Sequence, residues 1–326
     1  KLPEEIDNYE IGLNILSHMF PQVTVHVAVD KKTFEQFKTS HGFRDKIKLY
    51  SIRPKHPQGL PEVLIWSLLG DKLPYGTFPI DKGVLVLEGE VPLIVYQAVV
   101  EGKPFIRRRL GIGGPGVKKE VVVDAPVGIS LKEAVDPFLC REAKFRLMIG
   151  GALTGSCQEN LSLPIGKEID SVVVLEEKIE REFLSFLRPG LRRPSYSRAF
   201  LSSLISTKRK EVDTNLHGEE RPCISCGFCE QVCPADILPY QIYRCFTHNL
   251  IDEVERLKPL ECIDCGLCAY VCPSKLPLTK TLKECKSKLS QEFNFVAYHK
   301  REGRLKLYKN ILSDSVKEMT DTKPKG

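Results

Sequence analysis

The sequence predicts a mixed α/β protein in which two small sheet-containing units precede a helical, cysteine-rich region. Three observations predict this class: helix and strand patterns alternate before residue 72, short strands punctuated by Gly and Pro follow, and a spaced cysteine motif occurs twice beyond residue 215. The chain has 326 residues, which at roughly 100–200 residues per domain is enough for two or three domains.

The first unit, residues 1–72, has the strand–helix–strand rhythm typical of a parallel sheet. Pro21 ends a run of apolar residues at helical spacing, and a β-branched run follows it. The expected elements are a helix at 4–19, a strand at 24–29, a helix at 31–38, a strand at 47–52 and a helix at 60–69. Two strands are too few for a complete domain, so we expect a partial α/β unit of the nucleotide-binding type, whose front half precedes Lys1.

The second unit, residues 73–175, is predicted to be a small mixed sheet with one packed helix. The expected elements are strands at 83–87, 105–110, 121–123 and 171–175 and a helix at 93–100. Residues 111–116 (GIGGPG) match the spacing G-x-G-x-x-G of phosphate-binding loops, but they do not open a helix. We therefore favour a tight turn between strands.

Basic stretches occur outside these units. Residues 176–214 are expected to form a charged helix at 176–187 followed by a basic connector, and residues 291–326 a surface tail, with docking to a complex as the alternative for the tail. The connector and Arg107 to Arg109 are interpreted as solvated faces, with docking to an acidic partner or to lipid head groups as the alternative. The net charge is only +6 and no aromatic residues interleave the basic runs, so we expect no nucleic-acid partner.

Residues 215–290 carry the most specific signal. The pattern C-x2-C-x2-C-x3-C-P occurs twice with a period of 39 residues and accounts for eight of the twelve cysteines. The members are Cys223, Cys226, Cys229 and Cys233 in the first run and Cys262, Cys265, Cys268 and Cys272 in the second. In two-cluster ferredoxins the fourth cysteine of each run binds the other cluster. We therefore predict one [4Fe–4S] cluster on Cys223, Cys226, Cys229 and Cys272, and a second on Cys262, Cys265, Cys268 and Cys233.

Neighbouring residues support the same interpretation. Gly227 and Gly266 follow the second cysteine of each run, where a bulky side chain would interfere with the cluster, and residues 238–257 supply the helix between the two loops. Zinc is the alternative, because C-x2-C pairs also bind zinc, but zinc requires neither the third cysteine nor the repetition. The isolated cysteines are interpreted as small buried side chains: Cys140, Cys157, Cys245 and Cys285.

No transmembrane segment and no catalytic residues are expected. Apolar runs are much shorter than the ~20 residues that span a bilayer, and the sequence contains no Ser/His/Asp set, no paired-carboxylate motif and no phosphate-binding loop. The chemistry that the sequence predicts is single-electron transfer rather than substrate conversion.

Several segments resemble a known family of membrane complexes. The segments 56–59 (HPQG) and 96–104 (YQAVVEGKP), and the cysteine blocks 222–239 and 261–277, resemble the C subunit of the Rnf ferredoxin:NAD oxidoreductase complex. Residues 176–190 and 197–202 (SRAFLS) resemble the related A subunit of the sodium-translocating NADH:quinone reductase. The sodium-pump subunits typically lack these cysteines, so the resemblance favours the Rnf-like or an ancestral, cluster-bearing branch.

The resemblance implies three domains: a partial Rossmann-like domain of the type found in the flavin subunit of NADH dehydrogenases, a β-grasp domain of the soluble-ligand-binding type, and a helical dicluster ferredoxin domain. It also implies a subunit of an NADH:quinone or NADH:ferredoxin oxidoreductase, rather than a complete enzyme, on the cytoplasmic face of the inner membrane. The implied partners are the membrane subunits and a ferredoxin or flavoprotein. FMN and NADH would need a domain ahead of Lys1. A soluble dicluster adaptor, similar to cobalamin reductases, is the runner-up, and a zinc-held interaction module is third.

Overall fold

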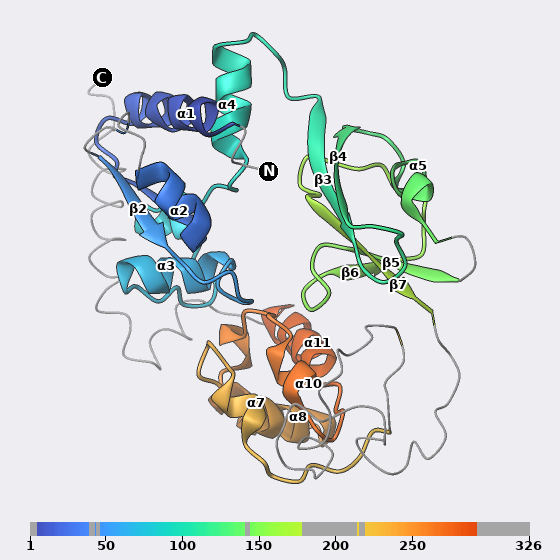
Figure 1. The fold of residues 1–326 in the computed structure, drawn as a ribbon. Coiled ribbons are helices and arrows are strands. Elements are labelled where there is room, and N and C mark those ends of the chain that lie inside the picture. The colour runs from blue at the N-terminus through green and yellow to red at the C-terminus, as the bar shows by residue number, and fades with distance from the viewer. Residues whose placement is uncertain are drawn as a thin grey trace, which may run out of the picture.

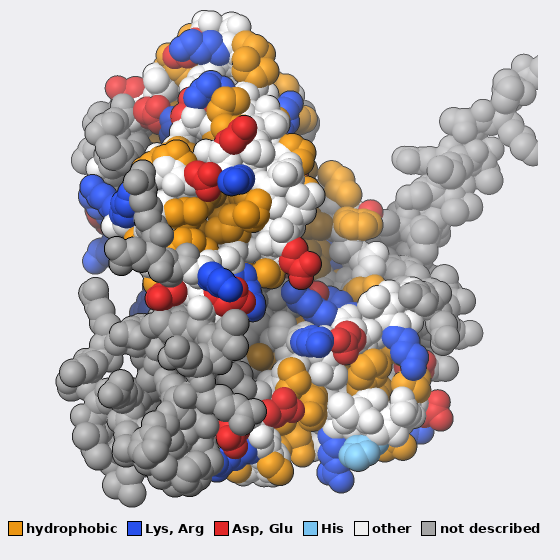
Figure 2. Space-filling model, turned by 90° about the vertical axis from the view of Figure 1, so that its right-hand side faces the viewer, with side chains coloured by type: hydrophobic (Ala, Val, Ile, Leu, Met, Phe, Trp, Pro, Cys, Tyr) orange, Lys and Arg blue, Asp and Glu red, His pale blue; other side chains and the backbone are white. Residues whose placement is uncertain are grey.

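The computed structural model describes residues 5–38, 43, 46–140, 144–177, 214 and 219–291. Figure 1 shows three bodies: helices and a small sheet in blue and teal, a green sheet, and a group of orange helices. We call them the α/β unit (α1 to α4), the sheet unit (β3 to β7) and the cluster domain (residues 219–291). On the face shown in Figure 2, acidic and basic side chains are interspersed.

The α/β unit contains a two-stranded parallel sheet with Val27 opposite Leu49. Its elements are α1 (Ile6–Met19), β1 (Val25–Val29), α2 (Lys31–Lys38), β2 (Ile47–Ser51), α3 (Pro61–Leu69), the 3-10 helix η2 (Pro79–Lys82) and α4 (Val91–Val99). The core joins Tyr9 and Leu13 of α1 to Phe37 of α2 and Leu93 of α4. The elements expected before residue 72 are therefore present to within a few residues.

The helix expected at 93–100 belongs to a different body from the one predicted. α4 packs against α1 of the α/β unit, where a Cβ on Gly12 would collide with the backbone of Pro92, instead of covering the green sheet (Figure 1). The strand expected at 83–87 is also wrong. No strand is assigned there, and Leu85 and Leu87 are 61% and 46% exposed, because their alternating pattern finds no described neighbouring strand to pair with.

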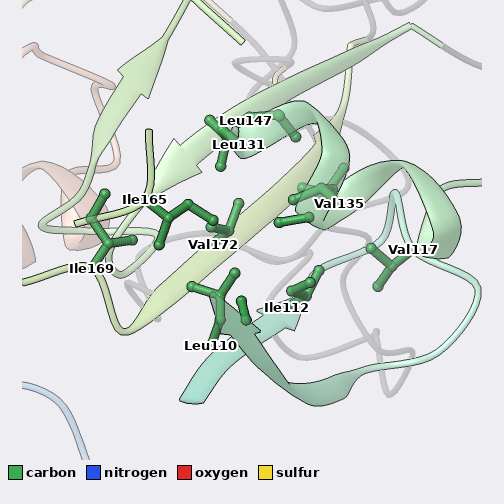
Figure 3. Close-up of a cluster of buried hydrophobic side chains, with 12 residues drawn as sticks. Leu110, Ile112, Val117, Leu131, Val135, Leu147, Ile165, Ile169 and Val172 are labelled. Atoms are coloured by element: carbon green, nitrogen blue, oxygen red, sulfur yellow. The ribbon is translucent and has the colours of Figure 1, made fainter. Parts of the chain in front are cut away.

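The sheet unit is a five-stranded mixed sheet with the order β4-β3-β7-β5-β6, in which β3 and β7 are parallel and the other neighbours antiparallel. Its elements are β3 (Arg107–Gly113), β4 (Val121–Pro126), α5 (Leu131–Val135), the 3-10 helix η3 (Asp136–Phe138), β5 (Phe145–Ile149), β6 (Ser156–Gln158) and β7 (Ser171–Glu176). Leu131 and Val135 of α5 point toward Leu110, Ile112 and Val172 on the sheet (Figure 3). Neither α5 nor the strands β5 and β6 were expected from the sequence.

The glycine stretch and the arginines of β3 differ from their simplest interpretation. Gly111 to Gly113 continue the strand, and the tight turn begins at Gly114, whose φ of +109° and close approach to the Val174 backbone suit glycine alone. Arg108 is 3% exposed rather than solvated, and its guanidinium lies 2.5 Å from the Glu88 carboxylate and 3.6 Å from that of Glu90. A buried guanidinium needs such partners. The prediction of a solvated face is therefore wrong for Arg108.

The cluster domain consists of short helices arranged as two copies of one pattern. Its elements are α7 (Phe228–Gln231), α8 (Pro239–Thr247), α9 (Ile251–Arg256), the 3-10 helix η4 (Pro259–Glu261), α10 (Leu267–Val271) and α11 (Leu278–Gln291). The helix expected at 238–257 is divided into α8 and α9, since Asn249 has a φ of +56°. The tail after 291, the basic connector and all but the first two residues of the helix expected at 176–187 lie outside the described residues.

Candidate metal centres

Each cysteine motif folds into the same loop and helix. Ser225 and Asp264 have φ values of +53° and +54°, and the glycines that follow the second cysteines, Gly227 and Gly266, have φ values of +71° and +79°. Both glycines cap short helices, α7 and α10. Glycine adopts this left-handed backbone conformation without the cost that other residues bear there. Residues 39 apart therefore occupy equivalent places in the two loops.

The eight motif cysteines lie around two cavities. The first, of about 150 Å³, is lined by Cys223, Cys226, Cys229 and Cys272. The second, of about 20 Å³, is lined by Cys233, Cys262, Cys265 and Cys268. Each cavity thus brings three cysteines of one run together with the fourth cysteine of the other. We call them the first and second centres; which cysteine binds which cluster stays a prediction.

Four of the motif cysteines are buried and four are half-buried; the buried ones are Cys229, Cys265, Cys268 and Cys272. Ile237, Leu276 and Leu278 belong to the core that also contains Cys229, Cys268 and Cys272. Burial raises the pKa of Cys262 to about 12 and that of Cys229 and Cys268 to about 11. Because iron binds thiolates, a positively charged metal has to supply the stabilisation that this environment withholds from a free thiolate.

Backbone amides offer part of that stabilisation. The amide of Ser225 donates to Sγ of Cys223 at 3.3 Å, and the amide of Asp264 donates to Sγ of Cys262 at 3.4 Å. Hydrogen bonds to cluster sulfur raise the reduction potential, and burial is another determinant of it. Buried thiols, amide donors and glycine-capped loops all fit iron–sulfur clusters.

The same geometry does not fit a single metal ion. Within the described ranges, no group of three or more His, Cys, Asp or Glu side chains is arranged to hold one ion. A zinc ion needs four ligand atoms within about 2.3 Å of one point. The cysteines of the first centre instead surround a cavity of about 150 Å³, which favours a cluster of several atoms over zinc there.

The second centre is enclosed by residues from outside the cysteine motifs. His56 of the α/β unit lies with Nε2 2.7 Å from the carbonyl oxygen of Cys265. Lys286 of α11 donates to the carbonyl oxygen of Cys262 at 2.5 Å and to the Asp264 carboxylate at 2.7 Å. Its ammonium also lies 5.9 Å from the centre of the Tyr75 ring. Sequence reasoning missed these contacts, although His56 belongs to the HPQG segment that carried part of the resemblance.

The sheet unit also reaches the second centre. A Cβ placed on Gly266 would lie 2.5 Å from the carbonyl oxygen of Leu153, in the turn between β5 and β6. At Gly227 of the first centre, a Cβ would meet no described atom within 4 Å, and the neighbouring Ile224 is 53% exposed. Ile224 is therefore largely open to water.

The isolated cysteines have different surroundings. Cys285 is fully buried in the core of the cluster domain, whereas Cys140 and Cys245 are half-buried. Cys157 is exposed on the edge strand β6, so the interpretation as a buried side chain is wrong there. None of the four lines either centre.

These features define a class of domain, the dicluster iron–sulfur domains of the ferredoxin type. The family of 4Fe-4S dicluster domains matches residues 222–276, which include all eight motif cysteines. The chain therefore carries a 4Fe-4S dicluster domain, as the cysteine spacing predicts.

Comparison with known proteins extends the similarity beyond this domain. The chain is 31% identical over 208 residues to the A subunit of the Na(+)-translocating NADH-quinone reductase of Marinomonas sp., covering 63% of this chain and 44% of that protein. It is 26% identical over 260 residues to the corresponding protein of Rhodopirellula baltica, covering 80% and 54%. It is 27% identical over 197 residues to the C subunit of the proton-translocating ferredoxin:NAD(+) oxidoreductase complex of Clostridium ljungdahlii, covering 60% and 35%.

The chain is thus a distant homologue of both kinds of protein, and it spans about half of their length or less. Among the described helices, none combines the length and the apolar character needed to cross a bilayer.

Proposed function

We propose that this chain is the electron-transfer subunit of a membrane-associated, ion-translocating NADH oxidoreductase that uses quinone or ferredoxin. The observation that carries the proposal is the pair of cysteine-lined cavities inside a dicluster domain whose chain is homologous to subunits of such complexes. Two clusters that share ligand runs suit the passage of single electrons, which needs no catalytic side chain. The subunit would lie on the cytoplasmic face of the inner membrane and bind the membrane subunits.

The finer fold assignment belongs to the same proposal. The parallel pair β1 and β2 with its helices supports a partial Rossmann-like domain related to the flavin subunit of NADH dehydrogenases. The mixed sheet with α5 packed on one face supports a β-grasp domain. FMN and NADH sites are not assigned to the described residues, and such sites would need a further domain.

The chain's own residues would hold and insulate the clusters. We assign Cys223, Cys226, Cys229 and Cys272 to one [4Fe–4S] cluster, and Cys233, Cys262, Cys265 and Cys268 to the other. When bound, each cluster supplies a one-electron redox couple. The amides of Ser225 and Asp264 point hydrogen bonds at the sulfur atoms, and the apolar core around Leu276 excludes water.

Replacement of single ligands tests the relay. Cys226→Ala should remove the signal of the first cluster in electron paramagnetic resonance, and Cys265→Ala that of the second, and each should block electron flow through the complex. Cys157→Ala, at an exposed site on β6, is the matched control. Unchanged electron flow after loss of either cluster would refute the relay.

A second pair of variants tests the exchanged ligands. If the fourth cysteines cross over, Cys233→Ala should remove the same signal as Cys265→Ala, and Cys272→Ala the same signal as Cys226→Ala. The opposite pairing would overturn the assignment while leaving the relay intact.

The runner-up function is a soluble dicluster adaptor of the same superfamily. It is favoured by the same cysteines and by the incomplete coverage of the relatives. Purification of the native assembly distinguishes the two, since recovery without membrane subunits would favour the adaptor. Zinc without acid-labile sulfide would refute both redox functions.

A further inference from the structure

The two centres have equivalent backbones but different surroundings. The second centre is in contact with His56 of the α/β unit and Leu153 of the sheet unit. In the repeat of 39 residues, Asp264 corresponds to Ser225 and Lys286 to Thr247, so the ion pair that fastens the second loop has no counterpart at the first. The second centre therefore faces the other two units, and the first centre is turned away from them.

A groove adjoins the first centre. It has a volume of about 490 Å³ and is built from the start of the cluster domain, helix α8 and the segment before α11. Cys223, Tyr240 and Leu276 line both this groove and the cavity of the first centre. Anything bound in the groove therefore lies directly against one wall of that centre.

The charges in the groove are mainly positive. Two guanidinium groups, those of Arg221 and Arg244, line it, together with one carboxylate, Glu220, which accepts a hydrogen bond from the Tyr243 hydroxyl. Neither guanidinium forms an ion pair with any residue in the part of the chain that the structure describes, and both side chains are exposed. Unpaired arginines beside a redox centre are available for carboxylates of a partner.

Exposed apolar side chains accompany these cations. Ile224, in the loop of the first centre, is 53% exposed, and Leu250, just beyond His248, is 50% exposed. A surface that mixes a few apolar contacts with unpaired cations is typical of transient redox interfaces, which are small and depend on electrostatic attraction.

We propose that the first centre is the point at which this chain exchanges electrons with a separate, acidic electron-carrier protein that docks on the groove lined by Arg221 and Arg244. This inference rests on the proposed electron-transfer function. One electron moves between the redox group of the carrier and the first cluster, so that one is oxidised as the other is reduced. No bond forms or breaks and no proton is required. The second centre then exchanges electrons on the side of the α/β and sheet units.

The test uses the full chain with both clusters assembled and a reduced, strongly acidic ferredoxin as the probe. Electron transfer is followed by stopped-flow absorbance at low and high salt. We expect the double variant R221E/R244E to slow transfer at least tenfold at low salt and to lose the salt dependence, because attraction between opposite charges is screened by ions. The transfer rate of the neutral variant R221Q/R244Q should lie between those of the original chain and of R221E/R244E.

The control is R256E/K280E, which changes the net charge by the same amount on α9 and α11, outside the lining of the groove. At about 0.1 M ionic strength, where the Debye length is about 10 Å, it should leave the rate within about twofold of the original, since charges outside the groove are then largely screened. Equal slowing in both double variants would show that only net charge matters, and an unchanged rate in R221E/R244E would place docking elsewhere. Either result overturns the proposal.

Two further measurements separate the possible failures. Chemical reduction of both clusters, monitored by electron paramagnetic resonance, should be normal in every variant. Failure to reduce them in the original chain would refute the relay itself. Normal reduction together with an unchanged transfer rate in R221E/R244E would refute only docking on the groove. If free FMN saturates the groove in the original chain but not in R221E/R244E, and the rate of electron transfer from the ferredoxin is the same with and without bound FMN, the groove is a small-ligand site and the protein partner is wrong.

Discussion

Gly266 and Gly227 form a matched pair for testing the contact between the sheet unit and the second centre. Both cap equivalent helices with φ values of +79° and +71°, so alanine at either position adopts the same unfavourable left-handed conformation, at roughly 1–2 kcal/mol. Only at Gly266 would the new Cβ lie 2.5 Å from the carbonyl oxygen of Leu153. Relief of such a collision costs a further 1–3 kcal/mol, roughly, in a packed region.

The turn carrying Leu153 can relieve this collision by moving away. Its amide hydrogen bond from Gly155 to Gly151, with an N···O distance of 2.7 Å, then opens more often. Each ~1.4 kcal/mol changes an equilibrium constant tenfold, so the additional strain should make hydrogen exchange in this turn about 5- to 150-fold faster for G266A. Exchange in the same peptide should be unchanged for G227A, whose Cβ meets no described atom within 4 Å.

The assay is native-state hydrogen exchange with mass spectrometry on the cluster-loaded chain, followed for the peptide that spans residues 150–158. Signals of both clusters are recorded in parallel, so that loss of a cluster is not mistaken for opening of the turn. Equal exchange in the two variants would show that the sheet unit does not rest on the second centre in solution. Of the two contacts that indicate an inward orientation of that centre, only the one with His56 would then remain.

Three further predictions concern charge and protonation. Lys286→Met should destabilise the loaded chain by about 2 kcal/mol in chemical denaturation, since it removes two charge-assisted hydrogen bonds and leaves Asp264 unpaired. Thr247→Met, at the equivalent place of the first loop, should lower the free energy of unfolding much less. Equal losses in the two variants would contradict the asymmetry of the loops. Arg108→Met should lower the free energy of unfolding by roughly 3–5 kcal/mol, because it leaves the half-buried Glu90 without that partner. Arg107→Met removes an exposed ion pair and should lower it by less than about 1 kcal/mol. Denaturation midpoints measure both losses, and similar losses would refute the buried network. Cluster assembly should become more favourable as the pH rises from 6 to 9, because burial raises the pKa of Cys262 to about 12 and the bound ligands are thiolates. The iron and sulfide retained at each pH measure assembly. A flat profile would refute the coupling between assembly and loss of the thiol protons.

Local patterns in the sequence predict most of the α/β unit and the loops of the cluster domain. Cysteine spacing is a local property, and so is the helical pattern of residues 31–38, which form α2 within the predicted limits. The element expected at 83–87 shows where this reasoning fails. Alternating apolar residues indicate a strand only if a neighbouring strand lies beside them, and the sequence does not reveal whether one does.

Long-range contacts account for the remaining differences. Helix α4 is adjacent to the sheet unit in the chain, which is why the sequence places it there, but Leu93 joins the core of α1 and α2. Arg108 resembles a surface residue in the sequence because its partners, Glu88 and Glu90, approach it only after β3 has folded back. Such contacts carry no periodic signal, so no pattern within one segment could have predicted them.

Under the proposed function, the internal repeat gives one motif two roles. The thiolates, glycines and left-handed residues of the two loops match position by position, so the clusters they hold should be chemically alike. Their differences come from outside the motif: Lys286 and His56 at the second loop, and Arg221 and Arg244 beside the first. A cluster closed in by its own chain is suited to passing electrons inward, and one beside an open, positively charged groove is suited to meeting a partner. A variant that carries both Ser225→Asp and Thr247→Lys should therefore form at the first loop the ion pair that Asp264 and Lys286 form at the second. It should also react more slowly with the acidic ferredoxin. An undiminished rate in that variant would show that the loop itself takes no part in partner access.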